Sequence, residues 1–252
     1  MFKRLKDAAQ LAKDLADAGR NYAVEKSEAT KNAIITVTDA TGFTTIRVPK
    51  LIFAMDATAS RETSWAMAMQ LQSEMVAMAG TEGLAIAIGY FNNEVCDVTS
   101  NYFTDARSAA SYMRSIRMSS CYTKIVPLLR EFEGHARNPN GARVAIFVGD
   151  SFEDNLAAVL VEAAKLKALG FRVFTLLEVG GSGGYVASGT EAAFRKLAEA
   201  TGGVFARFDA GAKPQLRELM QSIAAYTAGT LSITHQGAFA EALKALPPPA
   251  RK

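Results

Sequence analysis

Short apolar runs alternate with helical patterns along most of the chain, and this alternation constrains the fold more than any other feature. Most positions within each run are apolar, which indicates strands buried on both faces. They lie at residues 51–56, 84–91, 144–149, 171–179 and 204–208. Helical patterns lie at about residues 64–79, 105–117, 123–136, 155–169, 190–200 and 213–228. We therefore predict an α/β fold in which helices cover both faces of a mostly parallel sheet.

One pair of strands must depart from the parallel arrangement. The runs at 84–91 and 95–102 are separated only by a short polar turn at Asn92 and Asn93. A parallel crossover needs a dozen or more residues, so these two strands are expected to be antiparallel neighbours. The sequence thus predicts a doubly wound, mostly parallel sheet with one antiparallel edge strand.

The flanking segments divide the chain into three parts. We expect an N-terminal helix, a main domain that opens with a β-hairpin, and a C-terminal extension, at residues 1–32, 33–229 (hairpin 33–49) and 230–252. The N-terminal helix is interpreted as a packing helix, with docking of a partner as the alternative. Two β-branched runs, 34–38 and 44–48, predict the hairpin. The extension has a short strand pattern at 231–234 and a helical pattern at about 238–246, before three consecutive prolines end regular structure.

Charge and composition argue against several classes of protein. The formal net charge is only +3, without a basic stripe, so no nucleic-acid surface is expected. No stretch approaches the roughly 20 apolar residues of a membrane-spanning helix, and the first residues lack the pattern of a secretory signal. Cys96 and Cys121 are the only cysteines and have no metal-ligand spacing. We expect a cytoplasmic protein that contacts neither membrane nor nucleic acid.

Two carboxylates follow apolar runs at positions where such a sheet binds ligands. Asp56 ends the first run, 51–56, and Asp150 directly follows 144–149. If the chain winds outward from the first strand and then restarts beside it, these two strands are neighbours. Their carboxyl ends then flank the point where the strand order reverses, which is the usual ligand site. Two nearby carboxylates repel each other unless a cation or a proton intervenes, so the pair suggests a metal site.

Hydroxyl groups accompany these carboxylates. The loop at 56–60 reads D-A-T-A-S, so Thr58 and Ser60 each follow two residues after the preceding oxygen-bearing side chain. Thr123 offers a further hydroxyl at the start of a later helix. A set of oxygen ligands without His or Cys favours Mg²⁺, Mn²⁺ or Ca²⁺ over Zn²⁺.

Five residues in this order resemble the metal-ion-dependent adhesion site (MIDAS) of von Willebrand factor A-type (VWA) domains: Asp56, Thr58, Ser60, Thr123 and Asp150. That site has a D-x-S/T-x-S loop after the first core strand, a threonine in a later loop, and an aspartate that ends the fourth strand. Residues from about 50 to 228 follow the family's order of strands and helices. The resemblance implies that the three hydroxyls bind the ion directly and that the two aspartates mostly hold it through water.

The resemblance also implies a function. An ion with few direct negative ligands stays electrophilic, and an open coordination position would accept an Asp or Glu side chain of another protein. The expected role is therefore a non-enzymatic adaptor that uses a divalent cation, with Mg²⁺ favoured. Intracellular bacterial relatives of this type serve AAA+ ATPases or act in stress and phage-defence systems, and the resemblance implies partners of that kind.

Two other functions stay open. A haloacid-dehalogenase-like phosphotransfer enzyme also has an aspartate after the first strand, but it needs a second acid where this chain has Thr58. A structural VWA domain without a metal site is the other alternative, in which Asp56, Asp150 and Thr123 only cap helices or stabilise turns. Asp154 is interpreted as a cap for the helix that follows it.

Overall fold

The computed structural model describes most of the predicted main domain, at residues 35–38, 44–57, 84–92, 95–117, 124–179, 188–209, 213–229, 231 and 237–249. The predictions for the N-terminal helix at 1–32, for the helix at 64–79 and for residues 232–234 lie outside this set.

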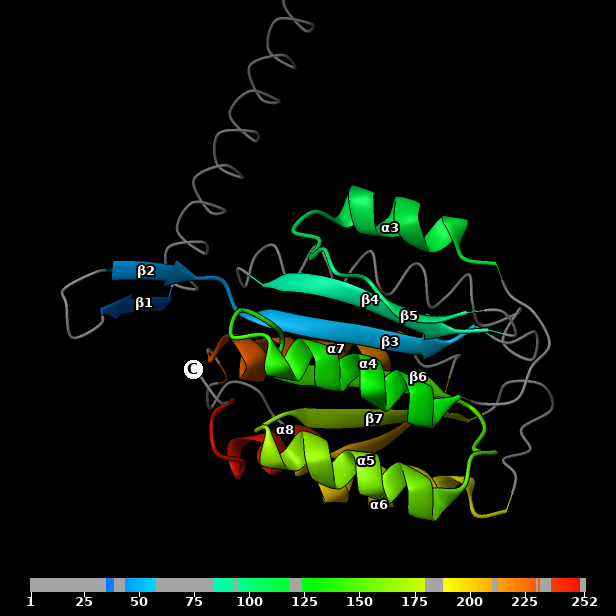
Figure 1. The fold of residues 1–252 in the computed structure, drawn as a ribbon. Helices are drawn as coiled ribbons and strands as arrows, with labels where there is room; N and C mark the ends of the chain where they lie inside the picture. The colour runs from blue at the N-terminus through cyan, green and yellow to red at the C-terminus, as the bar shows by residue number, and fades with distance from the viewer. Residues whose placement is uncertain are drawn as a thin grey trace, which may run out of the picture.

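A six-stranded sheet forms the centre of the molecule (Figure 1), with the strand order β5-β4-β3-β6-β7-β8. The strands are β3 (Lys50–Asp56), β4 (Ala85–Phe91), β5 (Cys96–Val98), β6 (Val144–Gly149), β7 (Arg172–Val179) and β8 (Phe205–Asp209). All neighbours are parallel except β4 and β5, which are antiparallel. The predicted doubly wound, mostly parallel sheet with one antiparallel edge strand is confirmed.

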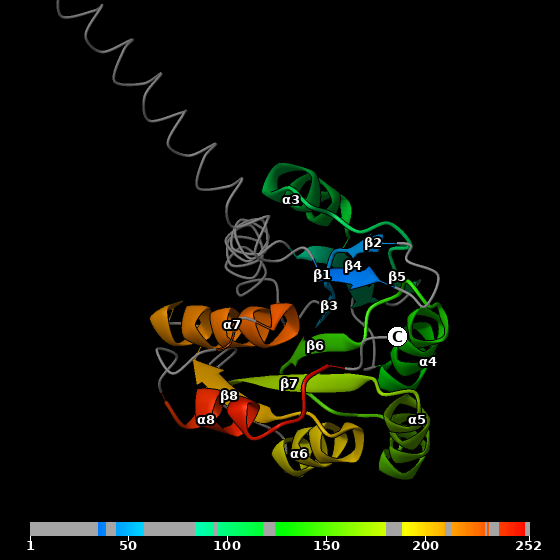
Figure 2. The same cartoon turned by 90° about the vertical axis from the view of Figure 1, so that its left-hand side faces the viewer.

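Helices cover both faces of this sheet (Figure 2), and the alternation of β3 side chains explains why. The described helices are α3 (Ala106–Ser115), α4 (Ile125–Arg137), α5 (Leu156–Ala168), α6 (Thr190–Thr201), α7 (Lys213–Ala228) and α8 (Ala238–Lys244). Ile52 and Ala54 pack in one core cluster with side chains of α4, α5 and α6. Phe53 and Met55 pack in the other with side chains of α3, α7 and α8. Among the described helices none is long and apolar enough to cross a membrane.

A separate two-stranded sheet precedes the central one. It consists of β1 (Ile35–Thr38) and β2 (Thr44–Arg47), which pair antiparallel as the β-branched runs predict. Figure 1 shows this hairpin beside the amino end of β3, at the opposite end of the sheet from the strand carboxyl ends.

The edge strand β5 is shorter than the predicted run at 95–102. The Thr99 hydroxyl accepts a hydrogen bond from Ile88 N (3.0 Å) in place of a backbone carbonyl. Thr99 N still donates to Ile88 O (2.9 Å), and the next bridge to β4 is an isolated one between Ile86 and Phe103. A side chain that competes for a backbone donor interrupts the ladder, so residues 99–102 leave the strand.

Candidate metal-binding site

The two aspartates of the predicted site lie at the point where the strand order reverses. The chain runs outward through β3, β4 and β5, and then β6 pairs with β3 on its other side. The register aligns Met55 with Val148, so Asp56 at the end of β3 and Asp150 directly after β6 sit at neighbouring carboxyl ends. The expectation that these two strands are adjacent is confirmed.

Both aspartates are at least half-buried, and one carboxylate oxygen has no partner among the described residues. Asp56 is only 1% exposed. Asp150 is half-buried, and its Oδ1 is hidden from solvent without a hydrogen-bond partner among the described residues. An unsatisfied buried acceptor costs about 1–3 kcal/mol, and more if it is charged. A hard cation is the kind of group that such an oxygen would bind, so these residues fit the predicted ion.

The three hydroxyl-bearing residues of the predicted site, Thr58, Ser60 and Thr123, lie outside the described residues. The last described residue before Thr58 and Ser60 is Ala57. Ala57 is buried, and its N–H donates to Phe91 O (3.0 Å) at the end of β4. Within the described part of the chain, no group of three or more His, Cys, Asp or Glu side chains could hold a metal. A cation here therefore requires the hydroxyls, and the five-residue set stays a prediction.

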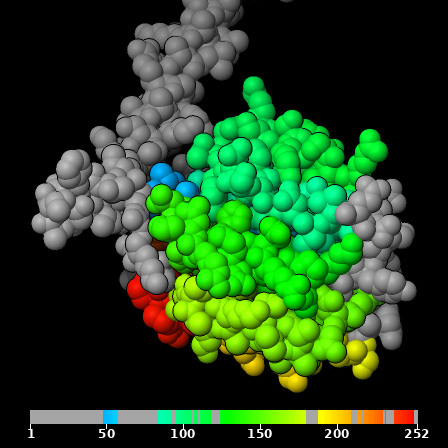
Figure 3. Space-filling view, in the orientation of Figure 1, coloured from blue at the N-terminus to red at the C-terminus, as the bar shows by residue number. Residues whose placement is uncertain are grey.

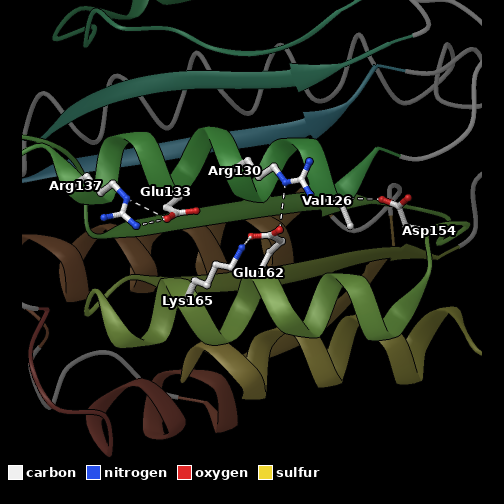
Figure 4. A network of polar contacts seen from close by, with 7 residues as sticks. All are labelled: Val126, Arg130, Glu133, Arg137, Asp154, Glu162 and Lys165. Atoms are coloured by element: carbon white, nitrogen blue, oxygen red, sulfur yellow. Dashed lines mark hydrogen bonds and ion pairs between the residues drawn. The ribbon is translucent and has the colours of Figure 1, made fainter.

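Asp154 acts on a different helix from the one predicted. Asn155, directly before α5, is the residue that caps α5, because its Oδ1 accepts from Ala158 N (3.1 Å). Asp154 Oδ2 instead accepts a hydrogen bond from Val126 N (2.9 Å) in the first turn of α4 (Figure 4). The prediction that Asp154 caps its own following helix is wrong because it lies one position too early to be the N-cap of α5.

Helices α4 and α5 are further joined by a charged contact. They lie next to each other across the front of the molecule, as green and yellow-green bands in Figure 3. Glu162 on α5 has a nearly buried side chain, and its Oε1 lies 3.2 Å from Arg130 Nε on α4. Lys165 Nζ donates to Glu162 Oε2 (2.8 Å), as Figure 4 shows. The hydrogen bond from Lys165, with a second from Arg130, holds the pKa of Glu162 below its usual value.

A third acid at this edge escaped the sequence reasoning. The register aligns Gly149 with Leu177, so Glu178 on β7 lines up with Asp150. Glu178 is only 3% exposed. The available signal was an acid near the end of the mostly apolar run 171–179, since a buried acid needs a partner or a role. It adds a buried carboxyl group to the sheet edge that ends in Asp56 and Asp150.

The sequence matches no family model, and no curated protein matches it either. Solved structures do resemble the fold. BatB from Bacteroides thetaiotaomicron aligns with a TM-score of 0.55 and 17% identity, over 70% of this chain and 98% of BatB. Mussel byssus proximal thread matrix protein 1, with a zinc-occupied MIDAS motif, aligns at 0.56 and 13%, over 75% of this chain and 48% of its own. The VWA domain of SpRpn10 aligns at 0.51 and 10%, over 70% and 95%.

The chain has the fold of a VWA domain. In this fold β3 is the first strand of the central sheet and β6 is the fourth along the chain. Asp56 and Asp150 thus occupy the two strand ends to which the MIDAS pattern assigns its aspartates. At such low identities the neighbours establish the fold alone, so any argument for a site depends on the residues of this chain.

Proposed function

We propose that this chain is a VWA module that binds another protein through a divalent cation. The cation would lie at the carboxyl ends of β3 and β6, between the segments that follow them. The observation that supports this most is the buried Asp150 Oδ1, which has no hydrogen-bond partner in the described part of the chain and lies at the strand end next to buried Asp56. A neighbouring fold with an occupied MIDAS makes a cation at this place reasonable.

The residues of this chain would share the work of holding the ion. Thr58, Ser60 and Thr123 would donate hydroxyl oxygens, while Asp56 and Asp150 would hold the ion through water. Bound there, the ion would supply positive charge that attracts a carboxylate of the partner. Oxygen-only donors favour a hard cation, so we propose Mg²⁺, with Mn²⁺ or Ca²⁺ as substitutes.

The proposed partner is a protein that presents an exposed Asp or Glu side chain. An AAA+ ATPase, or a component of a stress or defence system, is the kind of partner that the MIDAS resemblance implies. The proposed role is binding rather than catalysis, and neither Asp56 nor Asp150 would take part in a chemical reaction.

A chelator-controlled experiment tests this function. We expect Mg²⁺ or Mn²⁺ to raise the melting temperature of the wild-type protein, because a ligand of the folded state stabilises it. Asp56→Ala and Thr123→Ala should each abolish that rise, together with any partner capture that EDTA reverses. The absence of a cation-dependent rise in the wild type would refute the proposal.

Asp105→Ala is the matched control for these variants. Asp105 is an exposed N-cap, whose Oδ1 accepts from Ser108 N (2.8 Å) at the start of α3. It follows Phe103, which pairs with Ile86 near the amino end of β4, so it is remote from the strand carboxyl ends. We expect this variant to keep the full response to the cation.

A further inference from the structure

The side chain of Asp154 joins the segment that follows β6 to the start of α4, and these two segments flank the proposed site. Asp154 lies in the segment that leaves β6, four residues after Asp150. Its Oδ2 accepts from Val126 N, three residues after Thr123 and in the first turn of α4. The hydrogen bond spans 28 positions of sequence, so it is a tertiary contact between the two segments and not a local turn.

The residue at the N-cap position of α4 does not cap the helix. Its N-cap position is Lys124, whose side chain makes no capping hydrogen bond. A lysine has no acceptor to offer, and the first N–H groups of a helix need one. Asp154 supplies it from the neighbouring segment, and its negative charge also suits the positive end of the helix dipole.

The same two helices are held together farther along. Arg130 on α4 contacts Glu162 on α5, one helical turn beyond the first turn of each (Figure 4). With α4 and α5 packed side by side, the contact of Asp154 with Val126 adds a hydrogen bond between the start of α4 and the segment that follows β6.

From this placement we infer that Asp154 is a positioning residue for the cation site. It holds the start of α4, which Thr123 precedes by two positions in the sequence, against the segment that follows Asp150. It would act by accepting the hydrogen bond from Val126 N–H, and not as a ligand of the ion. This role agrees with the observation that its carboxylate is bound to a backbone amide. This inference depends on the proposed function, since it concerns the affinity of the same site.

The adjacent residue provides a matched control. Asn155 makes a cap of the same kind on α5, through Ala158 N at 3.1 Å, and does not contact α4 in this way. Asp154→Ala and Asn155→Ala therefore each remove one helix cap from neighbouring positions of the same loop. Only the first should disturb the relation between Thr123 and Asp150.

The experiment measures Mn²⁺ affinity by calorimetry in the wild type and in both variants. We expect Asp154→Ala to bind Mn²⁺ at least about tenfold more weakly, as is typical when a residue that orients a metal ligand is lost. Asn155→Ala should bind as the wild type does. Asp154→Asn keeps an acceptor for Val126 N–H and should restore most of the affinity. Exchange of the Val126 amide proton, followed by NMR without metal, should quicken in Asp154→Ala but not in Asn155→Ala.

Several outcomes would overturn the inference. Wild-type affinity in Asp154→Ala, or an equal loss in Asp154→Ala and Asn155→Ala, would remove the positioning role. A loss in Asp154→Asn as large as that in Asp154→Ala would make the charge of Asp154 the important property, as for a ligand. If Asp154→Ala does not fold, Asp154→Glu replaces it, because the longer side chain moves the acceptor, and the same weakening is expected. A wild-type protein that binds no Mn²⁺ would refute the proposed function and this inference together, whereas wild-type binding that Asp154 variants do not change refutes the inference alone.

Discussion

In the absence of metal, Asp150→Ala should be more stable than the wild type. In the presence of metal, it should be less stable than the wild type. The Oδ1 atom of Asp150 is hidden from solvent and has no partner among the described residues. Such an acceptor costs about 1–3 kcal/mol, and the half-buried position of Asp150 places it near 1 kcal/mol.

Metal should reverse this order of stability. With Mg²⁺ at about a hundredfold excess over its dissociation constant, a ligand that binds only the folded state adds about 2.7 kcal/mol. The wild type would gain this stabilisation and Asp150→Ala would not. Since the stabilisation by the metal exceeds the cost of burying Asp150 Oδ1, the wild type becomes the more stable protein.

Urea unfolding in EDTA and in Mg²⁺ measures all four free energies of unfolding. The expected result is a crossing: Asp150→Ala is more stable in EDTA, and the wild type is more stable in Mg²⁺. An unchanged slope of free energy against urea concentration would show that the variant unfolds from the same compact state. A variant that is less stable than the wild type by the same amount in both buffers would refute the reasoning, because Asp150 would then be a structural residue.

Three further changes test the packing and the titration of the fold. The low pKa of Glu162 stabilises the folded protein above the usual carboxyl range, so the stability gap to Glu162→Gln in urea should close as the pH falls below about 4. Burial lowers the pKa of His135 against the opposing influence of Asp97, so the wild type should lose stability as the pH falls below about 6.5, while His135→Asn shows a flatter profile. A Cβ at Gly149 would lie 3.1 Å from Phe194 Cζ and 3.3 Å from Phe147 Cζ; because these two buried rings stack on each other and neither can move away freely, Gly149→Ala should cost about 1–3 kcal/mol by urea unfolding.

The elements that could be predicted from the sequence are those whose ends are set by local chemistry. The apolar run at 144–149 is β6 to the residue, because the apolar pattern ends at the half-buried Asp150 that follows it directly. The end of α5 was equally local. Gly170 takes the left-handed conformation (φ 70°), which glycine adopts readily, and Phe171 N donates to Leu166 O (2.9 Å), which closes the helix.

The parts that could not be predicted depend on contacts between distant segments. The truncation of β5 follows from one hydroxyl, that of Thr99, which takes a backbone donor on the next strand. When Asp and Asn stand next to each other before a helical pattern, either side chain could cap that helix, since both are good N-cap residues. Only the position of α4 in the fold shows that the two residues cap different helices. Asp154 caps α4, and Asn155 caps α5.

The same distinction separates what the sequence says about the candidate site from what the structure adds. Strand ends carry their own signal, since an aspartate after an apolar run must lie at the sheet edge whatever surrounds it; Asp56 and Asp150 could therefore be chosen without knowing the tertiary structure. The geometry between those ends has no such signal, because it is set by backbone donors, such as Val126 N–H, that look alike in every sequence. If cation affinity here depends on Asp154, then a motif of five oxygen-bearing residues identifies a place for an ion, and the residues between them determine how tightly it is held.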